Sequence, residues 1–111
     1  MEKYLLELLE SFDIETYFIT RKNSSQAPCI VYNFIESPKA YSDDDEELTE
    51  YEVFFHIYAG DDIIDIKKRL MKLLKENGFQ KKPTSIPIYM DDLECYEQVL
   101  QYSKIFENTE I

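Results

Sequence analysis

The chain has 111 residues, of which 44% are hydrophobic and 14% aromatic, and its formal net charge is −11. A chain of this length builds one hydrophobic core, so we take residues 1–111 as a single domain. The apolar and aromatic content excludes a disordered acidic chain. The excess of acids disfavours a general nucleic-acid binder, which uses Lys and Arg to displace counterions from phosphates.

The negative charge is concentrated in one segment of the sequence. Residues 36–52 hold eight acids and one lysine, and so carry −7 of the net −11. Turn-forming residues and adjacent like charges predict a long, mobile hairpin loop over residues 37–48. The rest of the chain is a near-neutral domain into which this acidic segment is inserted.

In chain order, the first predicted elements are one helix and two strands. Five apolar residues share one side of a helix over residues 2–11, and they are Tyr4, Leu5, Leu8, Leu9 and Phe12. Residues 16–20 are all β-branched or aromatic, which predicts a strand. Residues 28–35 predict a second, central strand, because apolar side chains fall on both of its faces.

The third strand and the second helix have the clearest patterns. Over residues 49–59, a face with Tyr51, Val53, Phe55 and Ile57 alternates with a face that holds Glu52, Phe54, His56 and Tyr58. A helix follows Asp61 or Asp62, either of which can cap its free N–H groups, and it ends at Asn77-Gly78. Its predicted buried side chains are Ile63, Ile64, Ile66, Leu70, Met71, Leu73 and Leu74.

The C-terminal third is less regular until its last segment. Residues 80–94 contain two prolines and predict a loop with a short extended piece at 86–90. Residues 95–106 predict a last strand, with a helix as the alternative, because some of its apolar residues also fit helical spacing. As a strand, one of its faces holds Tyr96, Leu100, Tyr102 and Phe106 with Gln98 and Lys104, and the other holds Val99 and Ile105. Residues 107–111 predict a frayed tail.

These elements have the order α-β-β-β-α-(β)-β, which predicts an α+β fold. We expect a mostly antiparallel sheet of about four strands, joined by hairpins, with the two helices packed on one face. The other face of the sheet then carries aromatic side chains, and an exposed face of this kind often forms an interface.

The residue sets that carry known chemistries are mostly missing. Two glycines, Gly60 and Gly78, are too few for a Gly-rich phosphate loop, and no Cys/His cluster has zinc spacing. We interpret His56 as an ordinary strand residue and Cys29 and Cys95 as buried, reduced thiols. No apolar run approaches the ~20 residues of a membrane helix, and the acidic N-terminus is unlike a signal peptide. We therefore expect a cytosolic protein that is not an enzyme and uses no cofactor.

Two charged sets remain as candidate sites. The acidic run offers oxygen ligands without the alternating spacing and glycine of a calcium loop, so weak divalent binding, a solvated loop and a partner-facing loop stay open. It consists of Asp43, Asp44, Asp45, Glu46 and Glu47. The basic set is either a solvated helix face or the complement of that run, and copies could then pair head to tail into rings. It consists of Lys67, Lys68, Arg69, Lys72 and Lys75, followed by Lys81 and Lys82.

The element order and several segments resemble the small tail-completion, or tail terminator, proteins of long-tailed bacteriophages and prophages. The resemblance covers nearly the whole chain, from the N-terminal helix through the charged hairpin to the last strand. Its segments are residues 28–32 (PCIVY), 51–58 (YEVFFHIY), 73–79 (LLKENGF) and 89–103 (YMDDLECYEQVLQYS). Glu97-Gln98 departs from the His or basic residue expected after the tyrosine, which leaves open the member of the head-to-tail joining group.

The resemblance implies a structural role without catalysis or a cofactor. Such proteins form a hexameric ring at the head-proximal end of the tail tube, stop its growth and join it to the head connector. The implied locations are the virion tail and, during assembly, the host bacterial cytoplasm, where the subunit can still be a monomer. The hairpin loop of residues 37–48 would serve subunit contacts or the lumen. Acids at the lumen would repel passing DNA and keep the bore from binding it.

Two other functions stay open from the sequence. An acidic protein of this size also fits an immunity or inhibitor protein that covers the basic surface of a partner. A divalent-dependent enzyme built on the acidic run is the other. Self-association would distinguish the ring former from the inhibitor. A melting temperature that changes with added calcium or magnesium would indicate a metal site.

Overall fold

The computed structural model describes residues 2–18, 27–42 and 45–107, with the backbone alone for residues 2, 39–42 and 45–47. Its two helices and six strands follow one another along the chain. They are α1 (Glu2–Leu9), β1 (Glu15–Phe18), β2 (Cys29–Ser42), β3 (Asp45–Ala59), α2 (Ile63–Glu76), β4 (Gln80–Lys81), β5 (Ile88–Met90) and β6 (Cys95–Glu107).

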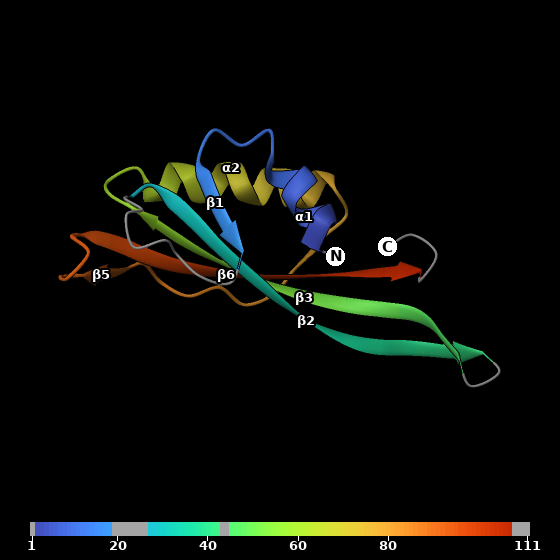
Figure 1. Cartoon of the computed structure of the whole chain (residues 1–111). Coiled ribbons are helices and arrows are strands. Elements are labelled where there is room, and N and C mark those ends of the chain that lie inside the picture. Colours follow the sequence, from blue (N-terminus) through green and yellow to red (C-terminus); the bar gives the residue numbers. More distant parts are fainter. Residues whose placement is uncertain (1, 19–26, 43–44, 108–111) are drawn as a thin grey trace.

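The described strands form one mixed sheet in the order β1-β2-β3-β6-β4, and β5 also pairs with β6. Both helices lie on the same side of this sheet (Figure 1). The predicted α+β class is therefore confirmed, whereas the expected sheet of about four hairpin-linked strands is wrong. β1 pairs with β2 in parallel, and β4 and β5 are two short segments that both pair with β6. Pro83 and Pro87 interrupt the chain between them, because proline lacks the N–H that a ladder needs.

The hydrophobic core lies between the helices and one face of β2, β3 and β6. The register places Tyr32 opposite Phe55 and Phe55 opposite Leu100, and all three side chains are buried. Each helix packs its predicted apolar stripe into this core. The buried members of the two stripes are Leu5, Leu9, Ile63, Ile66, Leu70 and Leu74. Each buried side chain of this size stabilises the fold by roughly 1.5–3 kcal/mol. Ile64 was predicted to be buried and is 42% exposed, because it lies about 100° around α2 from Ile63.

Glycine ends the second helix as predicted. Gly78 has a φ of 81°, the left-handed conformation that costs a residue without a Cβ least. The Gly78 N–H donates to the Lys75 carbonyl and the Phe79 N–H donates to the Leu74 carbonyl, which is the Schellman pattern. Phe79 is thereby turned back into the core and is 6% exposed. Asp62 takes the N-cap position without a side-chain capping bond.

The last segment is a strand, and the helical alternative for it is wrong. β6 pairs with β3 from Tyr96, opposite Ala59, to Glu107, opposite Leu48. Its alternation follows the strand prediction, with Leu100, Tyr102 and Phe106 buried on the core face and Ile105 exposed on the other. The long backbone ladder to β3 satisfies its hydrogen-bonding groups, which outweighs the apolar residues that also fit helical spacing.

The predicted loop over residues 37–48 is also wrong, because the hairpin strands extend through most of it. β2 continues to Ser42 and β3 begins at Asp45, with register shifts between Pro38 and Ala40 and between Ala40 and Tyr41. Like charges repel by only ~1 kcal/mol at 4 Å in water, which is too weak to prevent backbone pairing. Residues 36–42 and 45–51 form an extension that we call the hairpin arm, and it points away from the helices (Figure 1).

Candidate assembly surfaces

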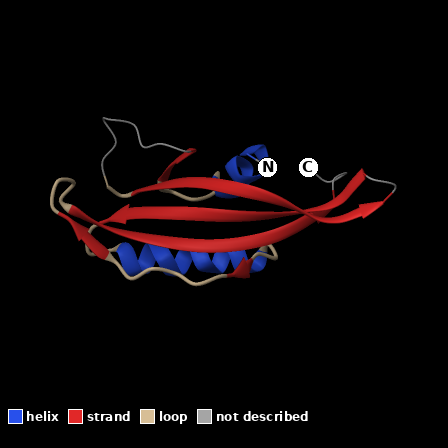
Figure 2. Ribbon diagram, turned by 90° about the horizontal axis from the view of Figure 1, so that it is seen from below, coloured by secondary structure: helices blue, strands red, loops and turns tan. Residues whose placement is uncertain are grey.

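One face of the sheet has no helix over it among the described residues. Figure 2 views the sheet from below, and no helix crosses in front of the strands. The register brings side chains from three strands onto this open face, and they include Val31, Asn33, Ile35, Phe54, His56, Tyr58, Val99, Gln101 and Ile105. Ile35 and Ile105 are 55% and 51% exposed, and Phe54, Tyr58 and Val99 are partly exposed. The predicted aromatic face of the sheet is therefore present and accessible.

Polar pairs occupy part of the open face. His56 Nδ1 lies 3.4 Å from Glu97 Oε2, and Gln101 Nε2 donates to Glu52 Oε2 over 3.3 Å. His56 lies within β3, in the strand predicted for it. Cys29 and Cys95 are buried, free thiols, which confirms that prediction as well. The open face is therefore amphipathic, since its apolar side chains alternate with the hydrogen-bonding side chains of these polar pairs.

Lys104 occupies an aromatic cage on the opposite, covered face. Its Nζ lies 5.1–5.5 Å from the ring centroids of Tyr4, Phe79 and Phe106. It donates to the Tyr4 hydroxyl over 3.0 Å and to the Asn77 carbonyl over 2.6 Å, at the negative end of the α2 dipole. Lys104 thus connects α1, the end of α2 and β6. The sequence placed Lys104 on the same strand face as Tyr102 and Phe106 but gave no signal for the cage, whose rings come from three distant segments.

The structure divides the predicted basic set between two roles. Arg69 Nη2 donates to Asp13 Oδ1 over 2.5 Å, and its guanidinium lies 4.9 Å from the centroid of the Phe12 ring. This hydrogen bond and the positive charge of Arg69 lower the pKa of the Asp13 carboxyl from its usual value. Arg69 therefore links α2 to the segment between α1 and β1. Lys67 and Lys68 lie on the first half of α2.

The other two predicted lysines of α2 line a groove. Its cavity has a volume of about 520 Å³, and its lining residues are Met71, Lys72, Lys75, Phe79, Lys81 and Tyr102. Phe79 and Tyr102 are buried beneath it, and burial raises the pKa of the Tyr102 hydroxyl. Lys72, Lys75 and Lys81 are exposed, and none of them has an ion-pair partner among the described residues. We call this cavity the lysine groove.

Sequence reasoning found the lysines of this groove and missed its apolar floor. The spacing of Lys72 and Lys75 on one side of α2 was a signal, since residues three apart share a helix face. Lys81 lies just beyond the Gly78 turn, so it returns to the same side. Tyr102 gave no signal, because its position under the groove depends on how β6 packs against α2.

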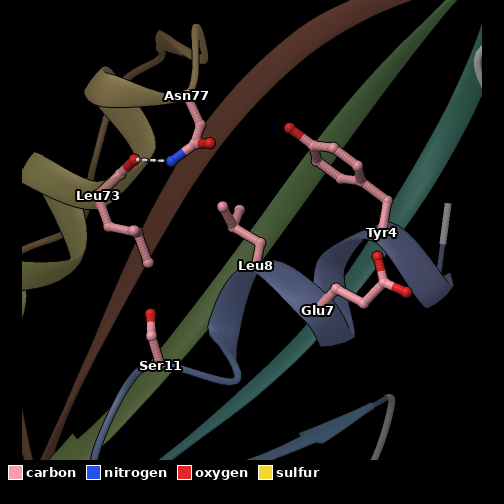
Figure 3. A pocket seen from close by; sticks show the side chains of 6 residues that line it. All are labelled: Tyr4, Glu7, Leu8, Ser11, Leu73 and Asn77. Atoms are coloured by element: carbon pink, nitrogen blue, oxygen red, sulfur yellow. Dashed lines mark hydrogen bonds between the residues drawn. The ribbon is translucent and has the colours of Figure 1, made fainter.

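A second cavity lies between the two helices (Figure 3). It has a volume of about 370 Å³, and its lining residues are Tyr4, Glu7, Leu8, Ser11, Leu73 and Asn77. In Figure 3, Tyr4 and Leu8 of α1 face Leu73 and Asn77, and the Asn77 side chain donates to the Leu73 carbonyl over 2.8 Å. The polar groups of this lining are the Tyr4 and Ser11 hydroxyls, the Glu7 carboxylate and the Asn77 amide.

Asp43 and Asp44 lie outside the described residues, and Asp45, Glu46 and Glu47 are described by backbone alone, at the start of β3. The predictions of divalent binding and of a lumen position for these acids therefore stay predictions. Across residues 2–18, 27–42 and 45–107, no three His, Cys, Asp or Glu side chains come close enough together to hold a metal ion. In the same part of the chain, neither helix has the length and apolar character that a membrane span requires.

Comparison with known proteins gives no assignment for these surfaces. No protein-family model matches the chain, and no curated protein matches it.

Proposed function

We propose that this chain is a structural subunit of a phage or prophage tail, a tail terminator that forms a ring and joins the tail to the head. The observation that carries this proposal is the open face of the sheet, which holds apolar and aromatic side chains and has no helix over it in the described part of the chain. The sequence resemblance supplies the kind of assembly. The hairpin arm, which extends from the same strands, supplies a second contact element.

The open face is suited to contact with another protein. A sheet is stable when both faces are covered or when one face is polar. Here Ile35 of β2 and Ile105 of β6 lie on either side of β3, near the base of the hairpin arm. Phe54 lies on β3 itself, further from the arm. Their exposed area is apolar, so covering it in a subunit interface is favourable, at roughly 25 cal/mol for each Å² buried.

The proposed assembly is a hexameric ring that sits on the head-proximal end of the tail tube and faces the head connector. The subunit acts by shape and contact, without catalysis or a cofactor, and DNA passes through the ring without sequence-specific binding. It works in the virion tail and is made in the host bacterial cytoplasm, where it can remain monomeric until it meets the tube.

In the direct test, the purified protein is added to tail tubes from the phage or prophage that encodes it. The tubes are then examined by electron microscopy. We expect a ring at one end of each tube and no further tube growth. Phe54→Glu places a charge on the open face and should prevent capping, whereas Ile64→Glu on α2 should not. Uncapped tubes with wild-type protein would refute the proposal. A lasting monomer that binds a basic partner tightly would instead favour the inhibitor function.

A further inference from the structure

The lysine groove is a cavity whose three lysines have no ion-pair partner among the described residues. We propose that it receives the acidic end of the hairpin arm of a second copy of this chain. The inference rests on the proposed function, because it says how one subunit of the ring holds the next. It also chooses between the two places, interface or lumen, that the sequence left open for the acidic residues.

The chemistry of the groove selects an acidic segment that also has apolar atoms. Lys72, Lys75 and Lys81 bring three exposed ammonium groups around a floor formed by Phe79 and Tyr102. Lysine stems cover apolar surface while their charged ends stay in solvent, so such a groove presents both properties together. A carboxylate that meets an ammonium here makes a charge-assisted hydrogen bond, which is about twice as strong as a neutral one.

The hairpin arm supplies the matching charge. β3 begins with the acids Asp45, Glu46 and Glu47, and the next residue is the apolar Leu48. The hairpin arm therefore carries three consecutive acids at the start of β3. Like charges this close repel one another, and a basic groove removes that repulsion as well as adding attraction.

The acidic end lies far from the groove of its own chain. The β2–β3 ladder runs from Cys29, opposite Tyr58, to Ser42, opposite Asp45, with two register shifts next to Ala40. This ladder extends the arm away from the helices (Figure 1), whereas residues of α2 and β4 line the groove. The molecule is 52 Å along its longest axis. The contact must therefore join two copies.

A contact between two different surfaces of identical chains is heterologous. Each copy then has one free acidic end and one free groove, so the assembly propagates until it closes as a ring or grows as a chain. Acids held in grooves are neutralised by lysines. They would therefore lie at subunit contacts, and would not repel DNA across the lumen as the sequence had suggested.

The test is sedimentation equilibrium of the full chain over a concentration series at low and high salt. Lys72→Glu with Lys75→Glu reverses two groove charges, and Glu46→Lys with Glu47→Lys reverses two charges of the acidic end. The matched control is Lys67→Glu with Lys68→Glu, which makes the same charge change on the same helix outside the groove. We expect each reversed variant to weaken self-association at least tenfold, and the control to change it less than threefold.

Mixing the two reversed variants is the decisive arm of the experiment. The native acidic end of one variant fits the native groove of the other, and the reversed end fits the reversed groove, so the mixture should associate again. Association that is unchanged by groove reversal, a mixture that stays dissociated, or wild-type protein that never self-associates would overturn this contact. Tube capping by the groove variant would then show that the proposed function holds without it.

Discussion

The two faces of the sheet are built from the same strands but differ in how far their side chains are buried. Along β3, Val53, Phe55 and Ile57 are fully buried, whereas their neighbours Phe54 and His56 on the other face are partly exposed. Both faces contain aromatic residues, so composition alone does not separate them. The difference is that α1 and α2 both pack on one face. The covered face holds the hydrophobic core, and the open face is the one that we propose for assembly.

The largest expected effect is a difference in unfolding free energy between variants of two adjacent phenylalanines, one on each face of the sheet. Phe55→Ala removes a buried ring from the core and should lower the free energy of unfolding by about 3–5 kcal/mol. Phe54→Ala, one residue away on the open face, should cost less than about 1.5 kcal/mol, because its ring is partly solvated already. Urea denaturation of both variants measures the contrast. Equal losses would mean that the open face is packed as tightly as the core.

A smaller effect is expected at the lysine on the covered face. Lys104→Ala removes the donor to the Asn77 carbonyl and the Tyr4 hydroxyl and empties the aromatic cage, which should cost about 2–3 kcal/mol. Lys104→Met keeps most of the volume and should cost about half as much. Gln101→Ala on the open face is the control, with an expected loss under about 1 kcal/mol. Urea midpoints rank the three, and a larger loss at Gln101 would contradict this account of the cage.

The smallest effect concerns an ion pair that belongs to neither face. Arg69 lowers the pKa of Asp13, whose ordinary value is 3.8, so the ionised carboxylate stabilises the folded chain above that pH. This contribution is lost as the pH falls through the lowered folded pKa. Asp13→Asn should therefore melt slightly below the wild type at pH 7 and converge with it at acid pH. Asp92→Asn is the charge-matched control, and an equal shift in both variants would exclude the pair as the cause.

The sequence predicted the features that depend on neighbouring residues better than those that depend on contacts between distant segments. Alternation identified both faces of β3 and of β6, and helical spacing identified most of the stripes of α1 and α2. Gly78 predicted the end of α2. The candidate surfaces followed in part, since the open aromatic face and the basic residues of α2 were expected, but the floor of the lysine groove was not.

What the sequence determined by itself is the periodicity of each segment and the charges it carries, because side-chain spacing and capping depend on neighbours within a few residues. Only the tertiary structure decided that β1 pairs in parallel, that the hairpin continues through the acidic segment and that Tyr102 lies beneath three lysines. Each of these features depends on which distant backbone groups form hydrogen bonds with one another and on which side chains then come into contact. Local sequence patterns do not specify these long-range pairings.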